Sequence, residues 1–294
     1  MTDIATLNEM QAARRARLRL LSTSVRYVLL FAVGLVMLYP LIWLVGASFK
    51  TNSEIFSGAG FIPDNPTLDG YIRGWQTSTP YTFGRFFWNS FLIILPKVIG
   101  TAISCTMAAY AFARFDFPLK KILFGSVIAI LLLPNVVTRI PQYILFRDLG
   151  WLDSFLPLWV PSALAGDAFF VFMLVQFLRS LPSDMEEAAR VDGANSLQTL
   201  VYIVVPMLAP ALISVCLFQF MWTMNDFLGP LIYLSSVDKY PVSLALKLSI
   251  DTTEAFEWNR ILAMSVLTIA PALIVFFAAQ RYFIEGISSG GVKG

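Results

Sequence analysis

Long apolar stretches alternate with short polar segments along this chain. A helix that crosses a bilayer needs about 20 mostly apolar residues to span roughly 30 Å of hydrocarbon. Six stretches meet this requirement approximately, at residues 26–48, 86–112, 120–146, 156–180, 201–226 and 258–282. Prolines interrupt several of them, which is tolerated where neighbouring helices satisfy the freed backbone groups. The pattern predicts an all-α integral membrane protein with about six packed transmembrane helices.

Basic residues flank these stretches unevenly. Those that precede the first stretch, or lie between the second and third and between the fourth and fifth, are Arg14, Arg15, Arg17, Arg19, Arg26, Arg114, Lys120, Lys121, Arg179 and Arg190. Because short cytoplasmic loops are enriched in Lys and Arg, we expect both termini and the loop near residue 190 to be cytoplasmic. The loop at 51–85 and the segment at roughly 234–257 then face outward.

These patterns divide the chain into parts. We predict a cytoplasmic N-terminal helix along the inner membrane surface over 1–24, and a first transmembrane helix with its outer loop over 25–85. The main transmembrane domain follows over 86–282 and contains a cytoplasmic loop at about 183–205. A cytoplasmic C-terminal tail completes the chain over 283–294.

Composition agrees with a protein solvated mainly by lipid. The chain is 57% hydrophobic and only 14% charged, with a mean hydropathy of +0.70, whereas soluble domains carry about 25% charged residues. A net charge of +2 gives no indication of nucleic-acid binding. The sequence has no histidine, the commonest general base and transition-metal ligand. Cys105 and Cys216 fall inside apolar stretches as small hydrophobic residues, so we expect neither a catalytic nor a metal site.

The polar insert that begins at Ser183 contains ordered signals. Ser183 followed by Glu186 has the form of a capping box, and the helix that it begins is predicted to run to about Asp192. Gly193 supplies the left-handed residue that ends such a helix. Asn195 followed by Gln198 predicts the cap of a second helix leading into the fifth span. The sequence therefore predicts a helix, a sharp turn and another helix in a cytoplasmic loop.

The first of these helices carries alanine and charge on different faces. Met185, Ala188 and Ala189 share a face at helical spacing, whereas the charged residues Asp184, Glu187 and Arg190 point elsewhere. Alanine permits close approach of a partner's backbone. The residues alone support two interpretations equally, a docking surface for a partner outside the bilayer or an ordinary interfacial amphipathic helix.

The spacing of the whole insert resembles a known motif. Glu187-Ala188-Ala189, then Asp192-Gly193-Ala194, Ile203, Pro206 and Pro210 are similar to the EAA loop of ATP-binding-cassette (ABC) importer permeases. Two further segments, Trp222–Leu231 and Gln280–Gly294, resemble the carbohydrate-uptake permeases of maltose type. The resemblance covers nearly the whole chain from Tyr39 onward. It departs at Leu200, where we expect an aromatic residue.

This resemblance implies a fold, a mechanism and partners. The fold is the type I ABC importer (MetI-like) permease fold. The chain is then the transport subunit of an ATP-driven importer and not itself an enzyme. Its implied partners are a second permease subunit, two ATP-binding subunits that carry ATP and Mg²⁺, and an extracytoplasmic solute-binding protein. Gly286 and Gly291 have P-loop spacing, but Val292 stands where the motif requires lysine, so we expect no ATP site in this chain.

Individual residues receive roles from the same resemblance. Glu187 would pair with a basic residue of the ATPase subunit, Ala188 and Ala189 would enter its cleft, and Gly193 would make the turn. Asp192 and Ala194 belong to the same coupling motif. The C-terminal residues that would reach between two ATPase subunits are Gly290, Gly291, Val292 and Lys293.

Polar residues at membrane depth are functional candidates, because they are expensive to keep there. The candidates for a translocation path are Lys97, Asp167, Gln219, Asn225 and Asp226, with Arg139 nearer the outer end of its span. Lys97 and Asp167 either pair with each other or contact substrate. Asn225 and Asp226 lie where the fifth span ends, and they either shape that end or touch sugar.

The sequence also bears on the cargo and on two alternative classes of protein. The outer segments look most like those of permeases for oligosaccharides, including uronate-bearing ones. An ion-coupled secondary transporter is the alternative, and it would need a coupling carboxylate at mid-depth, for which Asp167 is the candidate. An intramembrane enzyme would need a nucleophile with a base or a metal cluster, and the lack of histidine makes this class a poor fit.

Overall fold

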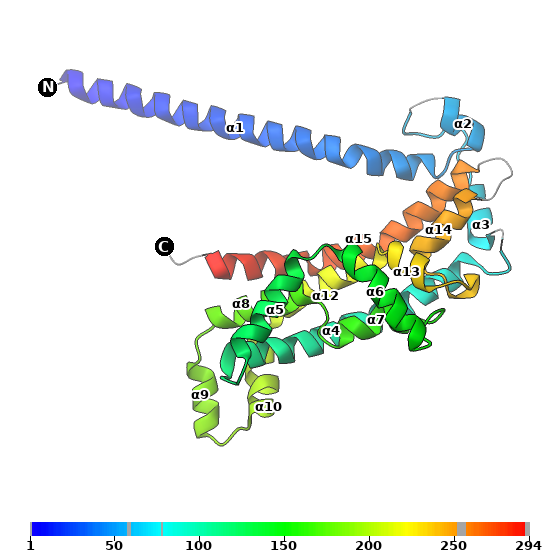
Figure 1. The fold of residues 1–294 in the computed structure, drawn as a ribbon. Helices are drawn as coiled ribbons and strands as arrows, with labels where there is room; N and C mark the ends of the chain where they lie inside the picture. The colour runs from blue at the N-terminus through cyan, green and yellow to red at the C-terminus, as the bar shows by residue number, and fades with distance from the viewer. Residues whose placement is uncertain (1, 58–59, 78, 252–256, 292–294) are drawn as a thin grey trace. The chain divides into compact units, whose positions relative to one another are not determined.

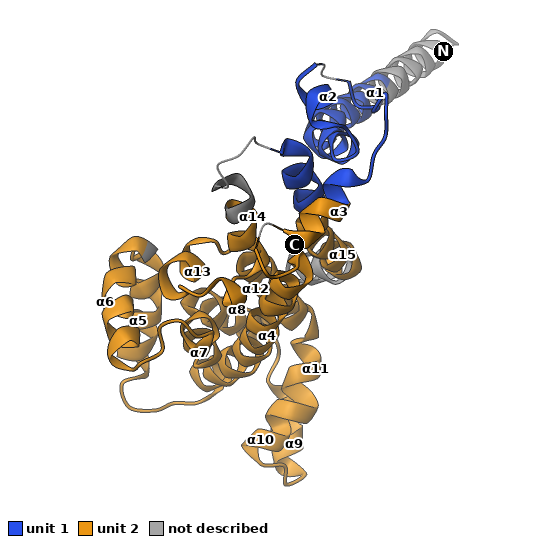
Figure 2. Ribbon diagram, turned by 90° about the vertical axis from the view of Figure 1, so that its right-hand side faces the viewer, with its two compact units in different colours: residues 1–71, 257–266 blue, residues 72–256, 267–294 orange. Residues whose placement is uncertain are grey.

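The computed structural model describes residues 2–57, 60–77, 79–251 and 257–291, and the regular structure within them is helical (Figure 1). The chain comprises two compact units (Figure 2). Unit 1 contains residues 1–71 and 257–266, and unit 2 contains residues 72–256 and 267–294. The predicted all-α membrane fold is confirmed.

Four helical segments are long and apolar enough to cross a bilayer, at residues 21–47, 83–114, 156–180 and 258–280. Two more candidate spans are broken helix pairs. The pair at 120–132 and 136–148 bends by 109°, and the pair at 196–207 and 209–224 bends by 79°. Together these segments correspond to the six stretches that the sequence predicts, and two of those six are interrupted by sharp bends.

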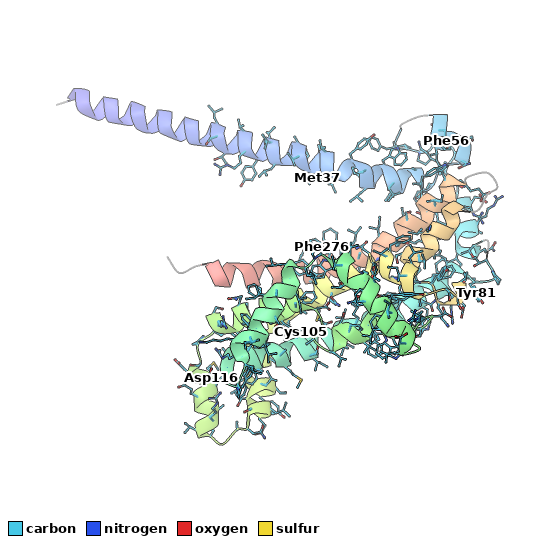
Figure 3. The ribbon with its side chains drawn as sticks, in the orientation of Figure 1. Met37, Phe56, Tyr81, Cys105, Asp116 and Phe276 are labelled. Atoms are coloured by element: carbon cyan, nitrogen blue, oxygen red, sulfur yellow. The ribbon has the colours of Figure 1, made fainter. Side chains whose placement is uncertain are left out.

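The helices of unit 1 include two that continue into unit 2. The unit contains α1 (Thr2–Ala47), α2 (Asn52–Ser57) and the first residues of α3 (Asp69–Gln76) and α15 (Trp258–Gly291). Apolar side chains of α1 such as Met37 are exposed (Figure 3), as expected of a helix that faces lipid. The helix is continuous across residue 24, so a separate surface helix over 1–24 stays a prediction.

The remaining helices belong to unit 2. They are α4 (Phe83–Arg114), α5 (Lys120–Leu132), α6 (Asn135–Asp148), α7 (Leu156–Ala163), α8 (Ala168–Ser180), α9 (Asp184–Val191), α10 (Ser196–Thr199), α11 (Val205–Met207), α12 (Ala209–Met224), α13 (Leu228–Tyr233) and α14 (Val242–Asp251). A π-helix over Leu200–Val204 joins α10 to α11, and a short 3₁₀ helix covers Val237–Lys239.

Helix α4 lies at the centre of unit 2 and packs against α7, α8 and α12. Cys105 and Phe170 are fully buried between these helices, and Figure 3 shows Cys105 in the interior of the bundle. Gly100 lets α4 and α7 approach closely, because a Cβ atom at this position would lie 2.5 Å from the Cβ of Ala163. The bundle therefore depends on small residues at a helix crossing, as membrane bundles often do.

A charged side chain ties two loops of unit 2 together. The carboxylate of Asp153 accepts hydrogen bonds from the backbone amides of Ser235 and Ser236, at 3.0 and 2.9 Å. It also accepts from the Ser236 hydroxyl at 2.6 Å and from the Lys239 ammonium at 2.8 Å. Desolvation raises the pKa of the Asp153 carboxyl, but these hydrogen bonds outweigh that effect and hold the pKa below its ordinary value.

Candidate coupling segment and polar cavity

The coupling segment, residues 183–205, projects from one end of unit 2 as α9, a turn and α10 (Figures 1 and 2). Gly193 has φ +87°, and a Cβ atom there would meet nothing within 4 Å. The backbone conformation, and not lack of space, therefore calls for glycine. The amide of Ala194 donates to the Ala189 carbonyl at 2.9 Å, and that of Gly193 to Arg190 at 3.1 Å. This is the Schellman arrangement, so the predicted helix end is confirmed.

One predicted cap of the coupling segment is confirmed and the other is wrong. The Asn195 side chain accepts from the Gln198 amide, and the Gln198 side chain accepts from the Asn195 amide, each at 2.9 Å. Ser183 makes no such box with Glu186. Its backbone is helical, with φ −84° and ψ −10°, where an N-cap residue is normally extended. Its hydroxyl donates instead to the Glu187 carboxylate at 3.0 Å.

Glu186 makes a buried ion pair that the sequence did not predict. Its Oε1 accepts from Arg114 Nε at 2.7 Å, and the two side chains are 3% and 12% exposed. Arg114, the last residue of α4, also donates to the Leu181 carbonyl at 3.1 Å, just before the coupling segment. The second Glu186 oxygen, Oε2, makes no hydrogen bond within the described residues. The charge of Glu186 therefore depends on Arg114, which fastens α9 to the end of α4.

The two alanines of the motif differ in exposure. Ala188 is exposed together with Glu187 and Asp192, whereas Ala189 is only 9% exposed and lies on the side of α9 that carries Glu186. Leu200, the departure from the family pattern, is buried in the core of unit 2. A partner that approaches α9 from solvent therefore meets Glu187 and Ala188 directly, while Ala189 is covered by the chain's own residues.

A second polar region lies inside unit 2. This polar cavity has a volume of about 290 Å³ and is lined by residues from α4 to α7 and from the segments that border α8 and α13. Its charged lining residues are Lys97, Arg139, Asp167 and Asp226. Three of the five predicted path residues, Lys97, Asp167 and Asp226, are thus brought to one cavity, and Arg139 joins them.

Of the two roles considered for Lys97 and Asp167, a direct ion pair does not form within the described residues. Asp167 Oδ2 accepts from Gln219 Nε2 at 3.0 Å and from Thr101 Oγ1 at 3.5 Å, and no ion pair to Lys97 forms within the described residues. Gln219 is 2% exposed and does not line the cavity. Its amide therefore holds the carboxylate of Asp167 in place from behind.

The neighbouring residues Asn225 and Asp226 have different surroundings. Asn225 is exposed, and its Nδ2 donates to the Met221 carbonyl at 2.8 Å, which also accepts from the Asn225 backbone amide at the end of α12. Asp226 lines the cavity, and its Oδ1 accepts from the Gly229 amide at 3.0 Å at the start of α13. Asn225 thus shapes the end of the span, whereas Asp226 both shapes it and reaches the cavity.

One residue that lines the cavity is not predicted from the sequence. Tyr233 is 3% exposed, lines the cavity, and its hydroxyl makes no hydrogen bond within the described part of the chain. A tyrosine in an apolar stretch carries no local signal of such a role, because it is equally at home in a core. Its position depends on the turn between α12 and α13, which the sequence does not predict in detail.

The C-terminal contact residues are only partly described. Gly290 and Gly291 are the last residues of α15. Val292 and Lys293 lie outside the described residues, so the predicted contact with ATPase subunits stays a prediction.

A bundle of apolar helices with a polar cavity inside it, and with an ordered helical hairpin at one polar end, is the architecture of a membrane transport protein. Residues 100–289 match the family described as the inner membrane component of binding-protein-dependent transport systems. The chain belongs to this family, the permeases of ABC importers.

Individual relatives agree with this assignment. A probable ABC transporter permease protein of Pyrococcus horikoshii is 32% identical over 264 residues, which cover 90% of this chain and 95% of the relative. The arabinooligosaccharides transport permease of Halalkalibacterium halodurans is 31% identical, with 89% and 93% covered. Among solved structures, a bacterial ABC transporter involved in the import of the acidic polysaccharide alginate matches with a TM-score of 0.78 and 25% identity, over 88% of this chain and 95% of that one. The chain is thus a transport subunit of the carbohydrate-uptake type.

Proposed function

We propose that this permease passes an oligosaccharide from an extracytoplasmic binding protein across the inner membrane by alternating access, driven by ATP on separate subunits. The oligosaccharide assignment is supported by relatives named for such sugars. The uronate-bearing version of the cargo rests on the resemblance of the outer segments and on the similarity to the importer of the acidic polysaccharide alginate.

The observation that carries the mechanism is the attachment of α9 to α4. The exposed side of α9 presents Glu187 and Ala188, while Glu186 on its buried side pairs with Arg114. Helix α4 also contributes Lys97 to the polar cavity. A displacement of α9 therefore reaches, through one helix, the region that a sugar would cross.

The cycle follows from this connection. ATP binding closes the paired ATPase subunits and moves the two clefts that hold the α9 helices of the two permeases. The permease subunits then rock so that the path between them opens outward, and the binding protein releases its sugar there. Hydrolysis restores the inward-facing state. The shift requires that ATP bind the closed state more tightly than the open one.

Partner contacts complete the proposal. Glu187 pairs with a basic residue of the ATPase subunit, and Ala188 enters its cleft, with Asp192, Gly193 and Ala194 forming the adjoining turn. Both termini face the cytoplasm, and the tail at Gly290–Lys293 reaches between the two ATPase subunits.

Charge reversal at Glu187 tests the docking assignment. In the complete complex reconstituted into vesicles, Glu187→Lys should abolish ATP-driven sugar uptake, because the new ammonium repels the basic partner residue. The amount of the permease in the membrane should not change. Asp116→Lys is the matched control, since Asp116 is fully exposed and lies at the same end of unit 2 (Figure 3). Full uptake by Glu187→Lys would overturn the assignment.

Two further measurements separate the alternatives. Uptake by the permease pair without ATP or ATPase subunits, driven by an ion gradient, would favour the secondary transporter. Uptake of labelled neutral glucan fragments, with no uptake of acidic oligosaccharides, would dispose of the uronate version of the cargo and leave the importer assignment intact.

A further inference from the structure

The cations of the polar cavity have no hydrogen-bonded partner among the described residues. Lys97 and Arg139 are both half-buried, and neither makes a hydrogen bond or an ion pair within the described part of the chain. A cation withdrawn from water is unfavourable unless it is paired and hydrogen-bonded. The two side chains come from α4 and α6, which are far apart in sequence, so the fold itself gathers them at one cavity.

The carboxylates of the cavity are differently placed. Asp167 accepts from Gln219 and Thr101, and Asp226 accepts from the backbone amide of Gly229. Each carboxylate is therefore fixed through one oxygen by donors of the same chain. Both lie close enough to Lys97 to offset its charge through space, but neither supplies the acceptor that a lysine or arginine N–H group requires.

A third donor belongs to a residue that lines the same cavity. The Tyr233 hydroxyl belongs to a side chain that is 97% buried, lines the cavity and makes no hydrogen bond within the described residues. Buried polar atoms are rarely left in this state. The unused hydrogen-bonding groups of the lining residues are therefore mainly donors, namely an ammonium, a guanidinium and a phenol.

We propose that this cavity is a sugar subsite within the present subunit, and that Lys97, Arg139 and Tyr233 bind the carboxylate of an acidic glycosyl unit there. This proposal rests on the proposed function and specifies its substrate class. A guanidinium binds a carboxylate through two parallel N–H donors. The ammonium and the phenol then complete the shell around the same anion.

The remaining features of the cavity suit a sugar ring. The free oxygens of Asp167 and Asp226 accept hydrogen bonds from ring hydroxyls, which are donors as well as acceptors. These carboxylates repel the carboxylate of an acidic sugar, so binding of that sugar depends on its direct contact with Lys97 and Arg139. The volume of about 290 Å³ lies just below the roughly 300–1,000 Å³ typical of ligand sites. It suits one glycosyl unit at a time and not a folded oligosaccharide.

The experiment compares two probes that differ only in the carboxylate. The first is a labelled uronic-acid trisaccharide, and the second is the same trisaccharide with its carboxyl groups reduced to primary alcohols. Initial ATP-dependent uptake is measured with the complete complex in vesicles. Arg139→Gln and Lys97→Met should each lower uptake of the acidic probe about tenfold, the loss expected of one charge-assisted hydrogen bond. Uptake of the reduced probe should change less than twofold.

Controls keep a folding defect apart from a binding defect. Arg147→Gln lies on the same helix as Arg139, at an exposed position beside Asp148, and should leave both uptakes unchanged. Tyr233→Phe removes only the hydroxyl and should lower uptake of the acidic probe alone.

The outcomes are distinguishable. Uptake of the acidic probe that resists all three cavity substitutions would overturn the subsite. Uptake of the reduced probe but not of the acidic probe by the unmodified complex would overturn the acidic substrate class, and the importer would stand. Failure of ATP to drive uptake of either probe would count against the proposed function itself.

Discussion

The coupling segment and the polar cavity both place charged side chains around α4, but they treat those charges differently. At the end of α4, Arg114 is paired with Glu186 at 2.7 Å and also holds the Leu181 carbonyl. Near the middle of the helix, Lys97 lies beside a cavity without any hydrogen-bonded partner in the described residues. The first arrangement fixes the position of a backbone segment. The second leaves donors available to something that enters.

This difference separates structural from functional charge on one helix. The sequence places Lys97 within a span, as a candidate for the translocation path, and Arg114 beside that span, among the basic residues that set the orientation, but it does not show which of the two is paired. Pairing geometry distinguishes them, because a paired charge stabilises the folded chain, whereas an unpaired charge is available to bind a ligand. Substitutions on the two sides of the comparison should therefore differ in what they damage.

Removing the paired arginine should have the largest effect on stability. Arg114→Ala leaves the Glu186 carboxylate buried and uncompensated, which costs about 3–5 kcal/mol. Thermal unfolding of the purified protein in detergent measures the loss. The double variant Arg114→Met with Glu186→Met should recover most of it, since an apolar pair of similar volume replaces the ion pair. An unchanged unfolding midpoint for Arg114→Ala would show that the pair is not structural.

The Asp153 contacts offer a second paired charge, at a loop. Asp153→Ala removes the acceptor for Lys239 and for two backbone amides, and should lower stability by about 1.5–3 kcal/mol, the range of a hydrogen bond to a charged group. The same unfolding assay measures it. Asp148→Ala is a control at an exposed carboxylate with a single arginine partner, and it should cost much less.

The Asp153 contribution should also depend on pH. Since its pKa in the folded state lies below the ordinary value, the contribution is complete above the unfolded pKa of about 3.9. It is lost as the pH falls through the lower folded pKa. The stability difference between the unmodified protein and Asp153→Ala should therefore be constant from pH 7 to about pH 5 and shrink below that. A difference that grew on acidification would contradict the assignment.

The turn of the coupling segment should respond more mildly. Gly193→Ala forces an alanine into the left-handed region, at a cost of about 1–2 kcal/mol, and its Cβ meets no neighbour. Gly193→Asn should cost less, because asparagine tolerates this conformation. Equal stability of both variants would show that the turn can rearrange.

The smallest effect on stability should come from the cavity. Lys97→Met breaks no hydrogen bond within the described residues. It removes the unfavourable burial of a cation, but Asp167 and Asp226 then lose a nearby positive charge. The free energy of unfolding should change by less than about 1 kcal/mol. Uptake of an acidic sugar by this variant should nevertheless fall. A loss comparable to that of Arg114→Ala would place Lys97 among the structural charges and break the comparison.

Local signals in the sequence predicted much of this molecule. The six apolar stretches, the left-handed Gly193 and the Asn195 cap depend on residues within a few positions of one another, so they could be recognised without a fold. The predicted Ser183 capping box does not form, because the Glu186 carboxylate pairs with Arg114 instead. Arg114 lies 72 residues away along the chain, so local sequence gives no sign of this pairing. The sequence left the partner of Asp167 open for a similar reason, since its donor, Gln219, comes from another helix.

The cavity could be predicted only in part. Lys97, Asp167 and Asp226 were candidates because charge at membrane depth is costly. Arg139 was assigned only to the outer part of its span, and Tyr233 was missed. Both depend on bends, one between α5 and α6 and one after α12, whose angles follow from packing across the bundle. Sequence patterns give the presence of such breaks more readily than their direction.

The 109° break between α5 and α6 has a consequence for the membrane itself. Ending one helix and starting another inside a span leaves amide and carbonyl groups without intrahelical partners. Such groups are tolerated at membrane depth only where protein covers them or water reaches them. Ile130 and Leu133, at the end of α5, line the polar cavity. The break therefore borders the polar cavity, so a hydroxyl-rich solute meets polar side chains and not lipid at this part of the span.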